Sequence, residues 1–97
     1  MRRFVRGRFV YALITTMATT DKKLDRLVTA LGEAIRKRRQ AKNLSQEALA
    51  GIADFDRTYV SLLERGERNP SFTNLCRIAA ALDTTPSELL KGIGYKA

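Results

Sequence analysis

Residues 57–65 place small polar and basic side chains at the spacing of a helix. At about 100° per residue, Val60 and Leu63 define the inward side of such a helix. The side chains that point away from this side or lie on its flanks are Arg57, Thr58, Ser61, Leu62 and Arg65. A helix with this face fits the major groove of DNA, where its first residues can hydrogen-bond base edges. A solvated helix face is the alternative interpretation of the same residues.

The composition of the chain argues against catalysis. Its 97 residues are 44% apolar and 29% charged, which is ordinary for one small globular domain. Histidine is absent, so the commonest general base and the commonest metal ligand are both missing. The single cysteine, Cys76, excludes an internal disulfide and a zinc site built from cysteines. We therefore expect neither an enzyme nor a bound cofactor or metal.

The charge of the chain indicates an acidic partner. Lysine and arginine number 18 against 10 aspartates and glutamates, which gives a net charge of +8. Nucleic acid is the first candidate for such a partner. The densest basic run comprises Arg36, Lys37, Arg38, Arg39 and Lys42. A solvated helix face explains this run equally well.

Residues 1–20 are predicted to be a separate basic extension that is flexible. They contain four arginines and no acidic residue, and the six residues 9–14 are apolar. Six is fewer than the roughly 7–15 apolar residues of a signal peptide, and no stretch approaches the ~20 of a membrane span. We expect Met17 to be the natural start; a transit peptide and a basic arm along DNA are alternatives. The domain then covers residues 21–97, with a cytoplasmic location and no membrane contact.

Five short helices are predicted to position these residues. The first carries an apolar stripe of Leu24, Leu27, Val28, Leu31 and Ile35. Asn43 is expected to end it in a left-handed conformation. Ser45 is the expected N-cap of the second helix. The buried face predicted for this second helix consists of Ala48, Leu49, Ile52 and Ala53.

Cap residues also delimit the remaining three helices. Asp56 is the expected N-cap of the third helix, which ends at Gly66. The fourth helix follows Pro70 and Ser71, with inward residues Phe72, Leu75, Ile78, Ala79 and Leu82. A capping box over residues 85–88 opens a short fifth helix. No segment alternates convincingly with the period of a strand, so the predicted fold class is all-α.

Four motifs follow one another in the central part of the chain. They are Ile35-Arg36-x-x-Arg39, Leu44-Ser45-Gln46-Glu47-x-Leu49-Ala50, Asp56-Arg57-Thr58-Tyr59-Val60-Ser61 and Glu64-Arg65-Gly66-x-x-x-Pro70-Ser71. In this order they resemble the Cro/C1-type, or Xre-family, helix-turn-helix domain, and the resemblance runs from Leu31 to Leu90. It implies a compact five-helix, lambda-repressor-like DNA-binding domain. Asp54 departs from the family pattern, which has glycine in the turn, but aspartate tolerates a left-handed conformation better than most residues.

The resemblance implies roles for individual residues. Arg57, Thr58, Ser61 and Leu62 match positions that read bases, with packing of Leu62 against Tyr59 as the alternative for that leucine. Phosphate contacts are expected from Gln46, Tyr59, Arg65, Arg68 and Asn69. The resemblance also implies that Arg39 and Glu64 form a structural ion pair between the first helix and the end of the third.

Apolar residues near the C-terminus predict a dimer interface. Four large ones fall within a short stretch, namely Leu89, Leu90, Ile93 and Tyr95. An exposed cluster of this kind favours contact with a partner, although folding back onto the first helix is the alternative. A two-fold dimer would place two recognition helices about 34–36 Å apart, which is one turn of DNA.

Together these features predict a sequence-specific transcriptional regulator that binds double-stranded DNA as a homodimer on a palindromic operator. No small-molecule ligand is expected. The start of the third helix, Asp56-Arg57-Thr58-Tyr59, resembles the controller proteins of restriction–modification systems. Phage-type repressors and the antitoxins that autoregulate toxin–antitoxin pairs share the same core, so both stay open. A protein adaptor with this fold that does not read DNA is a further alternative.

Overall fold

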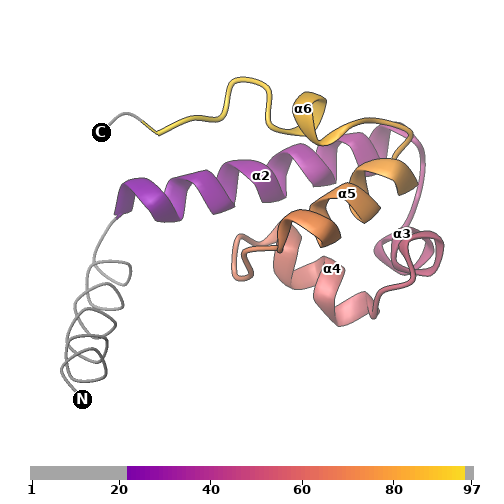
Figure 1. The fold of residues 1–97 in the computed structure, drawn as a ribbon. Helices are drawn as coiled ribbons and strands as arrows, with labels where there is room; N and C mark the ends of the chain where they lie inside the picture. Colours follow the sequence, from indigo (N-terminus) through magenta and orange to yellow (C-terminus); the bar gives the residue numbers. More distant parts are fainter. Residues whose placement is uncertain (1–21, 96–97) are drawn as a thin grey trace, which may run out of the picture.

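The computed structural model describes residues 22–95, and within this range the chain forms helices and no strand. In chain order these are α2 (Lys22–Ala41), α3 (Gln46–Ala53), α4 (Arg57–Glu64), α5 (Phe72–Ala81) and α6 (Pro86–Leu89). The long α2 runs along one side, α4 and α5 pack below it, and the C-terminal segment returns along its upper side (Figure 1). The predicted all-α fold of five helices is confirmed. The expectations for residues 1–20 and for Met17 concern residues outside the described range.

Side-chain caps fix where three of these helices begin. The hydroxyl groups of Ser45, Ser71 and Thr85 each accept a hydrogen bond from the backbone amide three residues later, at 3.0–3.2 Å. These bonds satisfy amides that have no partner within the helix. Asp56 occupies the predicted N-cap position of α4, but its side chain makes no capping hydrogen bond.

Left-handed residues end α2 and α4 as predicted. Asn43 follows α2 with a φ of 56°, and Gly66 follows α4 with a φ of 73°. Asparagine and glycine tolerate this conformation better than other residues. At Gly66 a Cβ atom would also lie 2.8 Å from the Thr29 hydroxyl oxygen, so α2 approaches this turn too closely for a side chain.

One apolar core joins the five helices. Each helix contributes at least one fully buried side chain, and these include Ile35, Leu49, Val60, Ile78 and Leu89. Small residues are buried between the larger ones, namely Ala50, Ala53, Ala79 and Ala81. Because these alanines are small, the short helices α3, α4 and α5 can pack close together. The core therefore packs α3 and α4 against the other helices.

Two residues that were predicted to be in the core are exposed. Ile52 is 59% exposed, because the buried side of α3 is centred near Ala53 and Ile52 lies about 100° away from it. Phe72 is 74% exposed, because it is the first residue of α5 and precedes the part of that helix that enters the core at Leu75. Both predictions were wrong because apolar character at helical spacing does not show which positions another helix covers.

Candidate nucleic-acid interface

A short turn sets the arrangement of α3 and α4. Asp54 adopts the left-handed conformation expected of it, with a φ of 60° and a ψ of 48°. The Phe55 amide then donates to the Ala50 carbonyl at 2.8 Å and closes the end of α3. Ala50 is only 2% exposed, and its small side chain allows α3 to pack directly against α4. Two helices joined in this way form a helix-turn-helix.

The first turn of α4 is open to solvent. Arg57 and Thr58 are exposed, whereas Ser61 and Leu62 are half-buried one turn later. The inward residues predicted for this helix, Val60 and Leu63, are fully buried. The N-terminal end of α4 is therefore the part that can enter a groove of DNA. Its exposed side chains include a guanidinium and a hydroxyl, which can both hydrogen-bond base edges.

Tyr59 is held at the surface of α4 by three neighbours. Its hydroxyl oxygen accepts a hydrogen bond from Asn74 Nδ2 at 3.0 Å, so its own proton remains available to donate. The Tyr59 ring lies 4.9 Å from the Phe55 ring, and the Arg68 guanidinium carbon lies 5.7 Å from the centre of the Tyr59 ring. A half-buried tyrosine with a free hydroxyl proton is suited to contact a phosphate.

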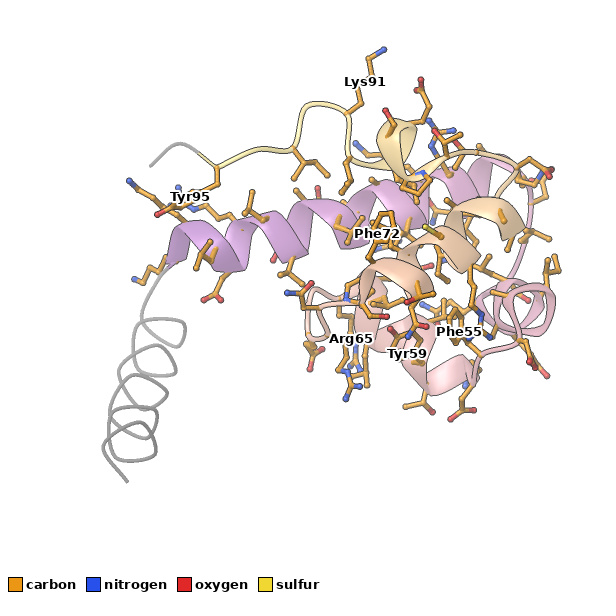
Figure 2. All side chains as sticks on the ribbon, viewed as in Figure 1. Phe55, Tyr59, Arg65, Phe72, Lys91 and Tyr95 are labelled. Atoms are coloured by element: carbon orange, nitrogen blue, oxygen red, sulfur yellow. The ribbon has the colours of Figure 1, made fainter. Side chains whose placement is uncertain are left out.

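The loop after α4 brings further polar groups to the same edge of the molecule. Arg65, Arg68 and Asn69 are all exposed, as a phosphate contact requires. Arg65 Nε lies 3.0 Å from a carboxylate oxygen of Glu67, but both side chains remain more than half exposed. Such a pair contributes little to stability, and Arg65 can exchange it for a phosphate. Figure 2 shows Arg65, Tyr59 and Phe55 around α4 in the lower part of the molecule.

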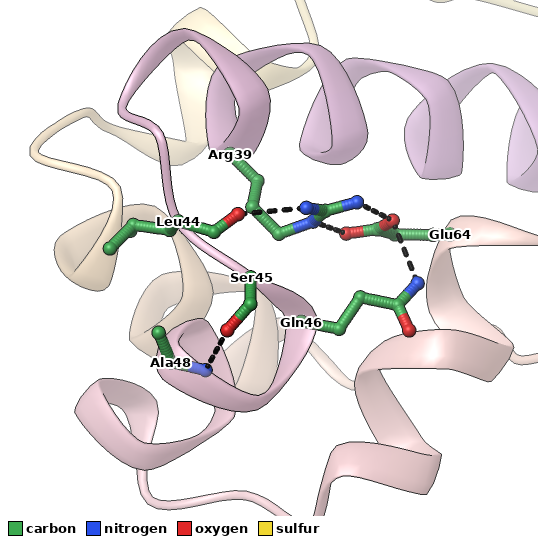
Figure 3. A network of polar contacts seen from close by, with 6 residues as sticks. All are labelled: Arg39, Leu44, Ser45, Gln46, Ala48 and Glu64. Atoms are coloured by element: carbon green, nitrogen blue, oxygen red, sulfur yellow. Dashed lines mark hydrogen bonds and ion pairs between the residues drawn. The ribbon is translucent and has the colours of Figure 1, made fainter.

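A polar network connects α2, α3 and α4 (Figure 3). The expected ion pair is present: Arg39 Nε and Nη2 donate to the two carboxylate oxygens of Glu64 at 2.6 and 2.9 Å. Arg39 Nη1 also donates to the Leu44 carbonyl at 2.8 Å. Gln46 Nε2 donates to Glu64 Oε1 at 3.1 Å. The network thus orients the amide of Gln46, whose second N–H can still donate to another group.

Burial makes this network a strong constraint on the fold. The side chains of Arg39 and Glu64 are only 12% and 3% exposed. Hydrogen bonding to Glu64 raises the pKa of Arg39 above its ordinary value, against the opposing effect of its own burial. Arg39 therefore stays charged, and its charge is balanced by Glu64. Within residues 22–95, no buried side-chain nitrogen or oxygen atom lacks a hydrogen-bond partner.

The four residues predicted for the dimer interface have different environments. Leu89 is 1% exposed and belongs to the core of its own protomer, so its assignment to the interface is wrong. The reason is that the single turn of α6 directs this side chain inward between α2 and α5. Leu90 and Tyr95 are 37% and 48% exposed, and Ile93 is half-buried against the core.

An apolar groove lies beside these C-terminal residues. It has a volume of about 560 Å³ and runs between the first turns of α2, the start of α5 and the C-terminal segment. Its lining includes Leu24, Leu27, Val28, Pro70, Leu75, Leu90 and Ile93. The sequence predicted only the C-terminal side of this surface. The predicted apolar stripe of α2 also contributes to it, because Leu24, Leu27 and Val28 line the groove.

Two further side chains at the helix-turn-helix were not predicted. Asn74 and Arg77 are three residues apart on α5 and reach Tyr59 and the turn before α4, respectively. Polar residues at this spacing on an otherwise apolar helix were the available signal. Among the described residues there is no cluster suited to bind a metal ion, and none of their helices is long and apolar enough to cross a membrane.

The fold and this site define a helix-turn-helix protein. A family model described as Helix-turn-helix matches residues 35–89, so the chain belongs to the helix-turn-helix family, of the Cro/C1 or Xre type. The control protein C.MunI of a Mycoplasma species is 48% identical over 63 residues, which cover 64% of this chain and 85% of that protein.

Solved structures agree with this assignment. The restriction-modification controller protein C.AhdI from Aeromonas hydrophila matches with a TM-score of 0.63 and 47% identity, over 64% of this chain and 94% of that chain. The DNA-binding domain of the C2 repressor of phage P22 matches with a TM-score of 0.62 and 34% identity, over 69% and 90% of the two chains. The predicted family and its repressor-like fold are confirmed.

Proposed function

We propose that this protein is a sequence-specific transcriptional regulator of the kind that controls restriction–modification systems. The observation that carries the proposal is the exposed first turn of α4 on a helix-turn-helix that is 47% identical to a solved controller protein. The control protein C.MunI is 48% identical over the matched residues, whereas the C2 repressor of phage P22 is 37% identical. The controller function is therefore favoured over that of a phage repressor.

In this proposal α4 enters the major groove and its side chains read base edges. Arg57 can hydrogen-bond O6 and N7 of guanine together, and Thr58 and Ser61 can hydrogen-bond either kind of base. Leu62 can contact a thymine methyl group. Arg57 and Thr58 are exposed, whereas Ser61 and Leu62 are half-buried. The last two can reach the bases only if α4 lies deep in the major groove.

Phosphate contacts on both sides of α4 would fix its position in the groove. Gln46 lies at the start of α3, where the positive end of the helix dipole favours a phosphate. Tyr59, Arg65, Arg68 and Asn69 supply donors from α4 and the loop that follows it. Contacts of this kind position the protein without reading sequence, and they make the affinity depend steeply on salt.

The apolar groove supports assembly into a homodimer. Leu90 and Ile93 line it, and Tyr95 is exposed near its C-terminal end. Water contact with such a surface is unfavourable, and a two-fold partner would cover the same residues on both protomers. A dimer would read two half-sites of a palindromic operator, which provides more specificity than one helix can.

Selection of bound sites from random duplexes tests the proposal directly. We expect recovery of a palindrome with half-sites about one helical turn apart. Duplex binding should weaken steeply as salt increases. A protein adaptor would show neither result, whereas an antitoxin would also form a complex with a toxin. The proposed regulator is not an enzyme, acts in the cytoplasm and requires no cofactor or small-molecule ligand.

A further inference from the structure

The side chain of Arg77, on α5, contacts the turn between α3 and α4. Its Nη2 atom donates to the carbonyl oxygens of Ala53 and Asp54 at 2.8 and 2.7 Å. Its guanidinium carbon lies 4.0 Å from the centre of the Phe55 ring. One side chain therefore binds three consecutive residues of the turn. The carbonyls at the end of α3 have no partner within the helix, and a cation is favoured there by the helix dipole.

These contacts continue from the turn into the first turn of α4. The rings of Phe55 and Tyr59 are 4.9 Å apart and tilted by 45°, and Asn74 donates to the Tyr59 hydroxyl at 3.0 Å. Asn74 and Arg77 lie on the same face of α5 because they are three residues apart. Figure 2 shows Phe55 and Tyr59 next to each other below α5. Adjacent side chains of α5 thus hold both the turn and the recognition helix.

We propose that Arg77 is a positioning residue for DNA binding, acting through Phe55 and Tyr59 to set how α4 sits relative to α3. This inference rests on the proposed function of the helix-turn-helix. Gln46, the predicted phosphate contact, is the first residue of α3, and Arg57, the predicted base contact, is the first residue of α4. The turn between the two helices therefore determines the distance between these two side chains. A turn that varied would have to be ordered on binding, and ordering lowers affinity.

The geometry at Arg77 depends on a guanidinium and not only on a positive charge. A planar guanidinium can stack on a ring while it donates to carbonyl oxygens, whereas an ammonium is a compact point charge. Arg77→Lys keeps the charge but loses the stacked arrangement over Phe55. This variant therefore separates positioning from a simple electrostatic attraction to DNA.

The test measures Kd at fixed salt for the selected operator duplex and for a random duplex of equal length. The full chain is used as wild type, Arg77→Ala, Arg77→Lys and Lys91→Ala. Lys91 is exposed and lies on the opposite side of the molecule from α4 (Figure 2), so it controls for the loss of one charge. We expect Arg77→Lys to bind the operator about tenfold more weakly and the random duplex as wild type does. Lys91→Ala should keep the wild-type ratio of the two affinities.

A double mutant tests the route through the turn. Adding Phe55→Leu to Arg77→Lys should cause little further loss of operator affinity. The effects of substitutions at two residues that act as one unit are not additive. Additive losses would show that Arg77 does not act through Phe55 and would contradict the inference. Faster hydrogen exchange of the Phe55 amide in free Arg77→Lys would support it, since that amide closes α3 on Ala50.

The remaining outcomes are distinct. Wild-type affinities of Arg77→Lys for both duplexes overturn the positioning role. Equal losses on both duplexes also overturn it, because they would identify Arg77 as a phosphate contact. If Arg77→Ala does not fold, the duplex affinities of Arg77→Lys test the inference, provided that this variant has the helical content of wild type. The proposed function itself fails if wild type binds the operator and the random duplex equally.

Discussion

Arg57 and Gln46 begin the two helices of the motif and are expected to contribute differently to DNA binding. The Arg57 side chain is exposed at the start of α4, where nothing in the described structure restrains its approach to a base. The Gln46 amide is oriented by its hydrogen bond to Glu64. An amide in a fixed orientation suits a contact with the regular phosphate backbone, whereas an exposed guanidinium suits a base edge.

Substitution of these two residues should separate specificity from affinity. Arg57→Ala is expected to weaken operator binding by about 1–3 kcal/mol and to relax the preference at one base pair. Gln46→Ala should weaken binding more evenly across sequences, because phosphate contacts carry no sequence information. Binding-site selection with both variants measures the difference. The base-reading role of Arg57 is excluded if its variant selects the same sites as wild type.

Glu64→Gln should lower the stability of the free protein. It removes the charge that balances Arg39 in a nearly buried site, for which losses of about 3–5 kcal/mol are typical. We expect the lower end of this range, because Arg39 stays 12% exposed and keeps its hydrogen bond to the Leu44 carbonyl. Thermal denaturation without DNA measures the change.

The exposed pair of Arg65 and Glu67 provides a matched control for this substitution. Both side chains are more than half exposed, so Glu67→Gln should change the stability by at most about 1 kcal/mol. Equal melting temperatures for Glu64→Gln and wild type would show that the buried pair does not stabilise the fold.

At the scale of the helices, the close approach of α2 to α4 helps to fix the position of α4. A Cβ atom on Gly32 would lie 2.4 Å from the Leu63 carbonyl oxygen and 2.8 Å from that of Glu64. Both are backbone atoms and cannot rotate away. The glycine therefore allows α2 to pack directly on the end of α4, beside the polar network of Arg39.

Gly32→Ala should move these helices apart and destabilise the protein by about 1–3 kcal/mol. Gly51→Ala is the matched control, because a Cβ atom there meets nothing within 4 Å. In that exposed helical position alanine should stabilise the protein by about 0.5–1 kcal/mol. Chemical denaturation of both variants measures the two effects. A stabilised Gly32→Ala would mean that α2 and α4 do not pack this closely.

At the scale of the whole molecule, the apolar groove determines the expected assembly. Ile93→Asp and Leu90→Asp should both yield monomers that retain helical content and bind the operator more weakly. Ile93 and the partly exposed Leu90 both line the groove, so each aspartate would place a charge in the contact. Sedimentation equilibrium at micromolar concentration measures the association.

Ile52→Asp is the control for the loss of an exposed apolar residue. Ile52 is more exposed than Leu90 but lies on α3 and does not line the groove, so this variant should associate like wild type. A wild-type monomer that binds a palindrome with a Hill slope of one would contradict the proposed dimer. Loss of association in Ile52→Asp would instead place the interface on α3.

Local patterns in the sequence were sufficient to predict the helices and their ends. Asn43, Ser45, Gly66 and Thr85 act as helix caps or stops as expected, because the preferences of these residues depend on nearby backbone groups alone. The left-handed turn at Asp54 was expected from the family pattern, which has glycine there, since aspartate tolerates this conformation. The order of the motifs also predicted the helix-turn-helix family, and the pairing of Arg39 with Glu64 was predicted from that resemblance.

Tertiary packing decided the features that depend on distance between helices. Apolar character did not reveal that Ile52 and Phe72 are exposed or that Leu89 is buried, because a side chain's environment depends on which helix covers it. Spacing along the chain likewise did not show that Gly32 meets α4, or that Arg77 reaches the turn 23 or more residues before it. Sequence determines local conformation through adjacent atoms, whereas contacts between distant segments exist only once the whole core has packed.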